Sequence, residues 1–97
     1  MNIKLSKIAS LLSLDLIGAD TNIHNLTIDS REVKKGDFFV AIEGKKYDGH
    51  DFIQESIDNG ASAILCNESF KTSEIKLLSS NKLLFIISYI FSIFIAF

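Results

Sequence analysis

The 97-residue sequence has a single cysteine, Cys66, and it has no proline and no tryptophan. One cysteine cannot form a disulfide within the chain, and such low usage is typical of a protein kept in a reducing compartment. Residues 1–10 hold no apolar core of the length that a secretory signal peptide needs. We therefore expect a cytoplasmic protein without disulfides.

An excess of positive charge is also missing. Ten Lys and Arg residues stand against twelve Asp and Glu residues, which gives a net charge of -2. Such a chain has no overall basic field to attract nucleic acid. We expect no nucleic-acid partner, and any anion-binding site must be local.

Motifs that bind nucleotides or perform hydrolysis are absent as well. The sequence contains no GxxxxGK[ST] phosphate loop, no GxGxxG, no GxSxG and no spaced cluster of metal ligands. We therefore expect no cofactor, no metal and no catalytic residue in this chain. With 97 residues it is one domain at most, and a domain of this size buries only a little over ~60% of its unfolded surface.

What is present is a segment, residues 26–67, in which short apolar runs alternate with turns. The unbroken apolar run 38–42 predicts a strand covered on both faces, which we expect to be the central strand. A second strand is expected over 61–66, parallel to the first, with a helix between them. The predicted fold class is therefore α/β, with a small mixed or parallel sheet, a βαβ crossover and flanking helices.

Two helices and their ends can be placed from the sequence. Apolar residues at helical spacing predict an amphipathic helix over 6–14, with Ser6 as its N-cap. The crossover helix is expected to begin at Asp48 or His50 and to end at Gly60, where a left-handed residue is favourable.

The remaining segments carry weaker patterns. Short strands are expected over 15–18, at the edge of the sheet, and over 26–29, with a turn-rich loop between them. A helix is expected over 73–78. Residues 83–97 carry no charge, and as a helix they would span roughly 22 Å, which is short of the ~30 Å hydrocarbon core of a membrane. Membrane contact through Leu83 to Phe97 is therefore the disfavoured interpretation.

Polar side chains that could bind an anion follow two of the predicted strands. Ser30 and Arg31 can converge on phosphate oxygens, while Lys45 and Lys46 could neutralise a diphosphate and Tyr47 offers a flat face to a base. Plainer alternatives remain for each: a serine that caps a turn, an arginine paired with a nearby carboxylate, and a solvated lysine pair.

Three other chemically active residues have two interpretations each. His50 lies between Asp48 and Asp51, so this cluster could bind a metal or act in acid–base chemistry, but a helix start explains it more simply. His24 stands in a turn-rich loop and is expected at the surface. Cys66 is expected to pack in the core, because a reactive thiol needs an exposed, electropositive setting.

Several motifs in this segment, in order, resemble the N-terminal domain of the Mur ligases, enzymes that add amino acids to the UDP-muramoyl peptide precursor of peptidoglycan. The matching residues are Asp29-Ser30-Arg31, Gly36-Asp37 to Ala41, Gly44, Asp48-Gly49-His50-Asp51-Phe52 and Gly60-Ala61-Ser62-Ala63. The resemblance covers residues 3–87. Its opening part is most similar to the family members that add D-alanyl-D-alanine, and the members that act at the tripeptide stage are the close alternative.

The resemblance implies a domain over 1–87 that binds the UDP end of a UDP-N-acetylmuramoyl peptide. The implied substrate-binding residues are Ile28, Ser30, Arg31, Lys45, Lys46 and Tyr47. In the family, ATP and magnesium are bound by further domains that this chain does not match, so we expect it to be inactive alone. We interpret residues 88–97 as an aberrant apolar tail that follows loss of the reading frame. The alternatives are a small tail-anchored membrane protein and a nonfunctional frameshift product.

Overall fold

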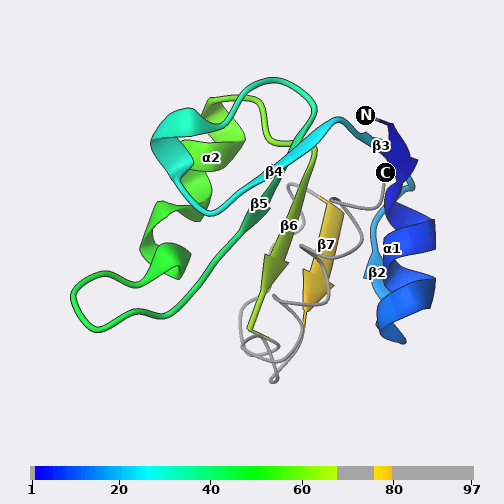
Figure 1. Ribbon diagram of the computed structural model, residues 1–97, viewed down its shortest axis with the longest axis horizontal. Coiled ribbons are helices and arrows are strands. Elements are labelled where there is room, and N and C mark those ends of the chain that lie inside the picture. The colour runs from blue at the N-terminus through cyan, green and yellow to red at the C-terminus, as the bar shows by residue number, and fades with distance from the viewer. Residues whose placement is uncertain (1, 68–75, 80–97) are drawn as a thin grey trace.

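The computed structural model describes residues 2–67 and 76–79, and in this part of the chain a five-stranded sheet has helices on both faces (Figure 1). In chain order the elements are β1 (Ile3–Lys4), α1 (Leu5–Leu12), β2 (Leu16–Ile17), β3 (Asn22–Ile23), β4 (Asn25–Thr27), the 3-10 helix η1 (Ser30–Glu32), β5 (Asp37–Val40), the 3-10 helix η2 (Gly49–Phe52), α2 (Ile53–Asp58), β6 (Ala63–Cys66) and β7 (Lys76–Ser79).

The strands of the large sheet lie in the order β2-β7-β6-β5-β4. Strands β4 to β7 are parallel to their neighbours, and β2 is antiparallel to β7 at one edge. The predicted α/β class is confirmed, with a mixed sheet and a crossover from β5 through α2 to β6. The expectation that β5 would be central is wrong: β6 is in the middle, because only β4 lies beyond β5, whereas β7 and β2 both lie beyond β6.

Side chains of β5 and β6 alternate between two apolar clusters, one on each face of the sheet. Phe38 and Leu65 belong to the cluster that includes the buried residues of α1, whereas Phe39 and Ile64 belong to the cluster around α2. All four side chains are at most 1% exposed. Because both faces are covered, the strand can be apolar at every position, as the run 38–42 predicted.

The cap of α1 differs from the prediction. The helix begins at Leu5, and Lys4 at its N-cap makes no side-chain cap bond. Instead, Ser6 donates from its backbone N to Asp20 Oδ1 at 2.9 Å and from its hydroxyl to Asp20 Oδ2 at 2.7 Å. Ser6 as N-cap is therefore wrong, because a carboxylate from a distant loop satisfies this N–H of the first turn.

The crossover helix begins and ends close to the predicted positions. Asp48 caps η2, since its Oδ1 accepts a hydrogen bond from the backbone N–H of His50 at 2.9 Å. The helical turns of α2 follow directly, and Gly60 has a φ of 105°, the left-handed conformation expected at this end.

Three short strands lie in segments where the sequence pattern was weak or misleading. The predicted loop before β4 contains β3, which pairs with β1 and places Ile3 opposite Ile23. The predicted edge strand is present as β2. The expected helix over 73–78 is wrong for 76–78, which belong to β7: pairing with β6 decides the conformation of a segment with little preference of its own.

The remaining expectations for the C-terminal part lie outside the described residues. These are the state of residues 73–75, the domain boundary after residue 87 and the apolar segment 83–97. Within 2–67 and 76–79, no helix has both the length and the apolar character that a membrane crossing requires.

Candidate functional site

A cavity of about 730 Å³ opens at the carboxyl ends of β4 and β5, the edge of a parallel sheet where ligand-binding loops gather. It is lined by four of the six residues that the sequence analysis selected: Ile28, Ser30, Arg31 and Tyr47. The first three follow β4 and Tyr47 follows β5, so the two strand-exit loops do meet. The structure thereby brings together the serine, the arginine and the aromatic ring that we expected to share a site.

The two lysines of the predicted site are not among the residues that line this cavity. Lys45 and Lys46 are exposed at the tip of a loop. A hydrogen bond of 2.8 Å from Gly44 N to the carbonyl of Tyr47 closes that loop at its base. Any contact between the lysines and a ligand must therefore be made outside the cavity.

Apolar side chains form much of the cavity wall. Phe39 and Ile42 come from β5 and the residues just after it, and Phe52 comes from the end of η2. The rings of Tyr47 and Phe52 meet edge to face, with centroids 6.4 Å apart, although Tyr47 remains 72% exposed. An exposed aromatic ring above an apolar wall can stack on a flat ligand group.

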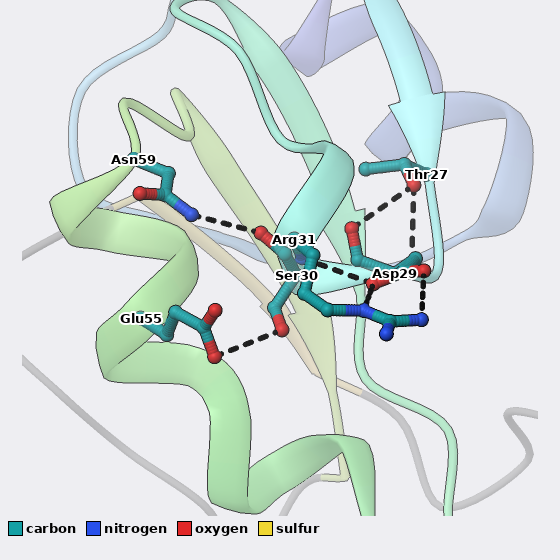
Figure 2. A network of polar contacts seen from close by, with 6 residues as sticks. All are labelled: Thr27, Asp29, Ser30, Arg31, Glu55 and Asn59. Carbon is teal, nitrogen blue, oxygen red and sulfur yellow. Dashed lines mark hydrogen bonds and ion pairs between the residues drawn. The ribbon is translucent and has the colours of Figure 1, made fainter.

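The guanidinium of Arg31 is already paired with Asp29 (Figure 2). Arg31 Nε donates to Asp29 Oδ1 at 3.0 Å and Nη2 donates to Oδ2 at 2.9 Å. Asp29 Oδ1 also accepts from the backbone N of Arg31, which caps η1. The hydrogen bonds from Arg31 hold the pKa of Asp29 below its usual value. The alternative of an arginine paired with a nearby carboxylate thus describes this structure.

Ser30 is held by one side chain of α2 and by that of its C-cap residue (Figure 2). Its hydroxyl donates to Glu55 Oε2 at 3.2 Å, and its carbonyl accepts from Asn59 Nδ2 at 3.0 Å. Ser30 is only 6% exposed. Its side chain does not cap the turn, because Asp29 does so.

The cluster around His50 acts as a helix start in this structure. His50 Nδ1 lies 2.6 Å from Asp48 Oδ1, and His50 Nε2 accepts a hydrogen bond of 2.8 Å from the backbone N of Asn67. An accepting Nε2 requires the proton on Nδ1 in the neutral ring. The backbone N–H of His50 is the main reason why the pKa of Asp48 is lowered. These contacts support the simpler of the two interpretations.

The resemblance implies ATP and magnesium for the whole ligases of this family, which we call the parent enzymes. The described residues do not fit either group. No group of three or more His, Cys, Asp or Glu side chains within 2–67 and 76–79 could hold a metal ion. The 97 residues contain no phosphate-loop motif either.

Sequence reasoning missed several residues that shape the cavity. Glu55 lines it and contacts Ser30, yet the two are 25 positions apart, so no local pattern links them. Gly49 lines it as well, and a Cβ there would lie 2.6 Å from the backbone N of Ile42. The only signal available in the sequence was that Glu55 belongs to the expected crossover helix, which begins at the same edge of the sheet; in the structure it lies in the first turn of α2.

The two single residues considered separately lie as expected. His24 is exposed. Cys66 is fully buried in the cluster around α2, and burial raises the pKa of its thiol from 9.0 to about 11. Core packing of Cys66 is therefore confirmed.

Comparison with known proteins gives one family for this chain. Residues 22–91 match the model described as the Mur ligase family, catalytic domain. A UDP-N-acetylmuramoyl-L-alanyl-D-glutamate--2,6-diaminopimelate ligase of Clostridium acetobutylicum is 40% identical over 72 residues, which are 72% of this chain and 15% of that protein. A UDP-N-acetylmuramoyl-tripeptide--D-alanyl-D-alanine ligase of Rickettsia prowazekii is 38% identical over 58 residues, 60% of this chain and 13% of that protein.

Solved structures agree with this result. The MurF ligase of Thermotoga maritima, solved in complex with ADP, has a TM-score of 0.60 and is 35% identical, over 68% of this chain and 15% of that one. A D-alanyl-D-alanyl ligase of Acinetobacter baumannii has a TM-score of 0.74 over 86% of this chain and 19% of that one, and at 22% identity it supports the fold alone. The chain spans about 12 to 15% of the length of the curated relatives. It belongs to the Mur ligase family, whose homologues act in peptidoglycan synthesis.

Proposed function

We propose that this chain binds the UDP end of a UDP-N-acetylmuramoyl peptide. The observation that carries the proposal is the cavity at the ends of β4 and β5, which gathers Ile28, Ser30, Arg31 and Tyr47 against an apolar wall. A ring can lie in the cavity against the apolar wall and the exposed ring of Tyr47, while charged groups of the same ligand remain near the rim. The family relationship supports this ligand, because the names of both curated relatives contain UDP-N-acetylmuramoyl.

The positively charged residues lie at the rim of the cavity or outside it, so different parts of the ligand are expected to bind in different places. Arg31, whose side chain is 81% exposed, lies at the rim, and Lys45 and Lys46 lie outside the cavity. In the proposed complex the diphosphate lies outside, where Arg31 and the lysines can approach it, and the base lies inside. The base and the diphosphate would thus be bound in two places, whereas the sequence pattern predicts a single cluster.

The affinity of this site is expected to be low. Two or three charge-assisted hydrogen bonds contribute roughly 1.5 to 3 kcal/mol each, whereas association costs about 4 to 15 kcal/mol. The dissociation constant should therefore be millimolar or weaker. No catalytic step is proposed for this chain, and the ATP-dependent ligation belongs to the parent enzymes. We also propose that residues 1–87 form the binding unit and that it works in the cytoplasm.

The first prediction concerns binding by the full chain, followed by amide chemical shifts in 15N–1H spectra. UDP-N-acetylmuramoyl tripeptide should shift the amides of Ser30, Tyr47 and Glu55 in a saturable way, and UDP alone should reproduce most of these shifts. The lysine pair should add electrostatic affinity, so Lys45→Gln with Lys46→Gln should weaken binding severalfold. Lys34→Gln with Lys35→Gln is the matched control, since it also removes two positive charges, from exposed residues that precede β5 at the opposite end of that strand. Absence of shifts around the cavity at high ligand concentration contradicts the proposal.

For the parent reaction we propose addition of D-alanyl-D-alanine, supported by the 35% identity to the MurF ligase of Thermotoga maritima. Addition of 2,6-diaminopimelate is the second candidate, favoured by the 40% identity to the ligase of Clostridium acetobutylicum. The two differ in the peptide that the UDP precursor carries. A ligase that adds D-alanyl-D-alanine, tested as the whole enzyme because this chain contacts only the UDP end, should bind the tripeptide precursor at least as tightly as the dipeptide precursor. A clear preference of the whole enzyme for the dipeptide precursor favours addition of 2,6-diaminopimelate.

A further inference from the structure

Two polar groups of Ser30, its hydroxyl and its carbonyl, are both held by side chains from one helical segment. Glu55 and Asn59 are four positions apart on the chain, at α2 and its C-cap, so they lie on the same side of the helix. Glu55 Oε2 contacts the hydroxyl of Ser30 at 3.2 Å, and Asn59 Nδ2 contacts its carbonyl at 3.0 Å (Figure 2). The position of Ser30 is thereby set by α2 as well as by its own turn.

The contact with Glu55 fixes the hydrogen-bonding direction of the Ser30 hydroxyl. A hydroxyl has one proton to donate and two lone pairs that accept, whereas an ionised carboxylate only accepts. In this pair Ser30 must therefore be the donor. Its oxygen then has only lone pairs to offer to a ligand in the cavity.

The other charged groups of the wall favour the same direction. Asp29 and Glu55 are two carboxylates on the lining, and Arg31, the single cation among the described lining residues, is engaged by Asp29. A phosphate group is negative and accepts hydrogen bonds, so this wall repels it and gives it little to bind. A neutral group that carries an N–H or O–H fits the wall better.

We propose that Glu55 is a positioning residue that accepts the hydrogen bond of the Ser30 hydroxyl, so that the Ser30 oxygen accepts a hydrogen bond from a donor group of the ligand. The inference rests on the proposed function, in which the ligand is a uridine nucleotide. The imide of uracil presents an N–H, whereas cytosine has an accepting nitrogen at the same place in the ring. Through Ser30, Glu55 would thus make the cavity prefer uracil to cytosine, in addition to any selection by shape.

The second prediction is a comparison of UDP with CDP on the full chain, with dissociation constants taken from amide shifts. The wild-type chain should prefer UDP by about tenfold, because CDP would leave two acceptors facing each other. Glu55→Gln should reduce this preference severalfold. The amide of Gln can donate to the Ser30 oxygen, which leaves the Ser30 hydroxyl free to donate to the ligand. Glu55→Asp keeps the charge but is one methylene shorter, and it should reduce the preference similarly.

Two controls separate this effect from loss of charge or of fold. Asp58→Asn removes one negative charge from the same helix at a residue that does not line the cavity, and it should keep the tenfold preference. In a Ser30→Ala background, Glu55→Gln should have no further effect on the ratio, because the residue through which Glu55 acts is missing. A well-dispersed amide spectrum verifies that each variant is folded.

The outcomes distinguish this inference from the function on which it rests. If both Glu55 variants keep the wild-type ratio while UDP still shifts the cavity amides, Glu55 does not position Ser30 and the inference is wrong, but the proposed function stands. If UDP produces no shifts around the cavity of the wild-type chain, the proposed function fails and the inference fails with it.

Discussion

Asp29 is the residue that changes the interpretation of the predicted anion site. Its carboxylate accepts hydrogen bonds from the backbone and from the guanidinium of Arg31, so the local turn and the ion pair depend on the same two oxygens. A phosphate that approaches Arg31 must share this cation with Asp29. The sequence predicts correctly that Arg31 follows β4, but Asp29, two positions earlier, decides how much of the arginine charge a ligand can use.

The third prediction concerns the thiol of Cys66. Burial raises its pKa from 9.0 to about 11, so at pH 8 the thiolate fraction should be roughly a hundredfold lower than for an unshifted thiol. Alkylation by iodoacetamide, followed by mass spectrometry, should be slow in the folded chain and fast in urea. Fast alkylation without denaturant would show that Cys66 is accessible.

The same shift has a consequence for stability at alkaline pH. Between pH 9 and about 11 the thiol ionises in the unfolded chain but stays protonated in the folded one. The unfolded state then binds fewer protons, so the free energy of unfolding must fall as pH rises through this range. Below pH 9 the thiol is protonated in both states and contributes no such slope.

At the scale of elements, contacts from distant segments complete the ends that local sequence leaves open. The first turn of α1 receives Asp20 from a loop fourteen positions beyond Ser6, and η1 receives Glu55 and Asn59 from α2. The hydrogen bonds from Ser6 lower the pKa of Asp20, so this cap should weaken as pH falls below the ordinary aspartate range. Periodicity located α1 and the crossover helix, because burial of one apolar face is a local pattern, but it could not identify these partners.

The fourth prediction concerns Gly49, where η2 meets the end of β5. A Cβ at this position would lie 2.6 Å from Ile42 N and 3.0 Å from Ala41 Cα, and backbone atoms cannot move away as a side chain can. Gly49→Ala should therefore destabilise the fold by about 1 to 3 kcal/mol and displace one wall of the cavity. Urea unfolding measures the first effect, and the UDP titration measures the second.

A suitable control for that substitution is Ser10→Ala, on an exposed position of α1. It should change the free energy of unfolding by no more than about 0.5 kcal/mol and leave UDP binding unchanged. Equal stability of the Gly49 and Ser10 variants would show that the end of β5 tolerates more movement than the close contact allows.

On the scale of the whole molecule, the two apolar clusters share one pair of strands. Strands β5 and β6 contribute side chains to both clusters, so neither face of the sheet can be loosened without exposing them. The short pair β1 and β3 forms a separate two-stranded sheet. Resistance to local opening should therefore be greatest in the interior strands and lower at the short pair.

The fifth prediction follows from this arrangement and is tested by amide hydrogen exchange. Amides of 38–40 and 63–65 should be the slowest to exchange among the described residues, because their strands have hydrogen-bonded neighbours on both sides. Amides of Ile3 and Ile23 should exchange faster, although both side chains are buried. Equal or greater protection at β1 and β3 would contradict this order.

The sequence alone determined the α/β class, the crossover and the edge of the sheet that carries the site. Unbroken apolar runs require strands covered on both faces, and the carboxyl ends of parallel strands meet at one edge. The sequence also selected Ser30, Arg31 and Tyr47, since polar or aromatic residues after strands are a local signal, whereas Ile28 was implied only by the resemblance to the Mur ligases. The side on which β2 and β7 join the sheet was decided only by tertiary structure, because short strands take their conformation from the partner with which they pair. The pairing of Ser30 with Glu55 was decided in the same way, since a hydrogen bond between residues 25 positions apart exists only after β5, η2 and α2 have packed.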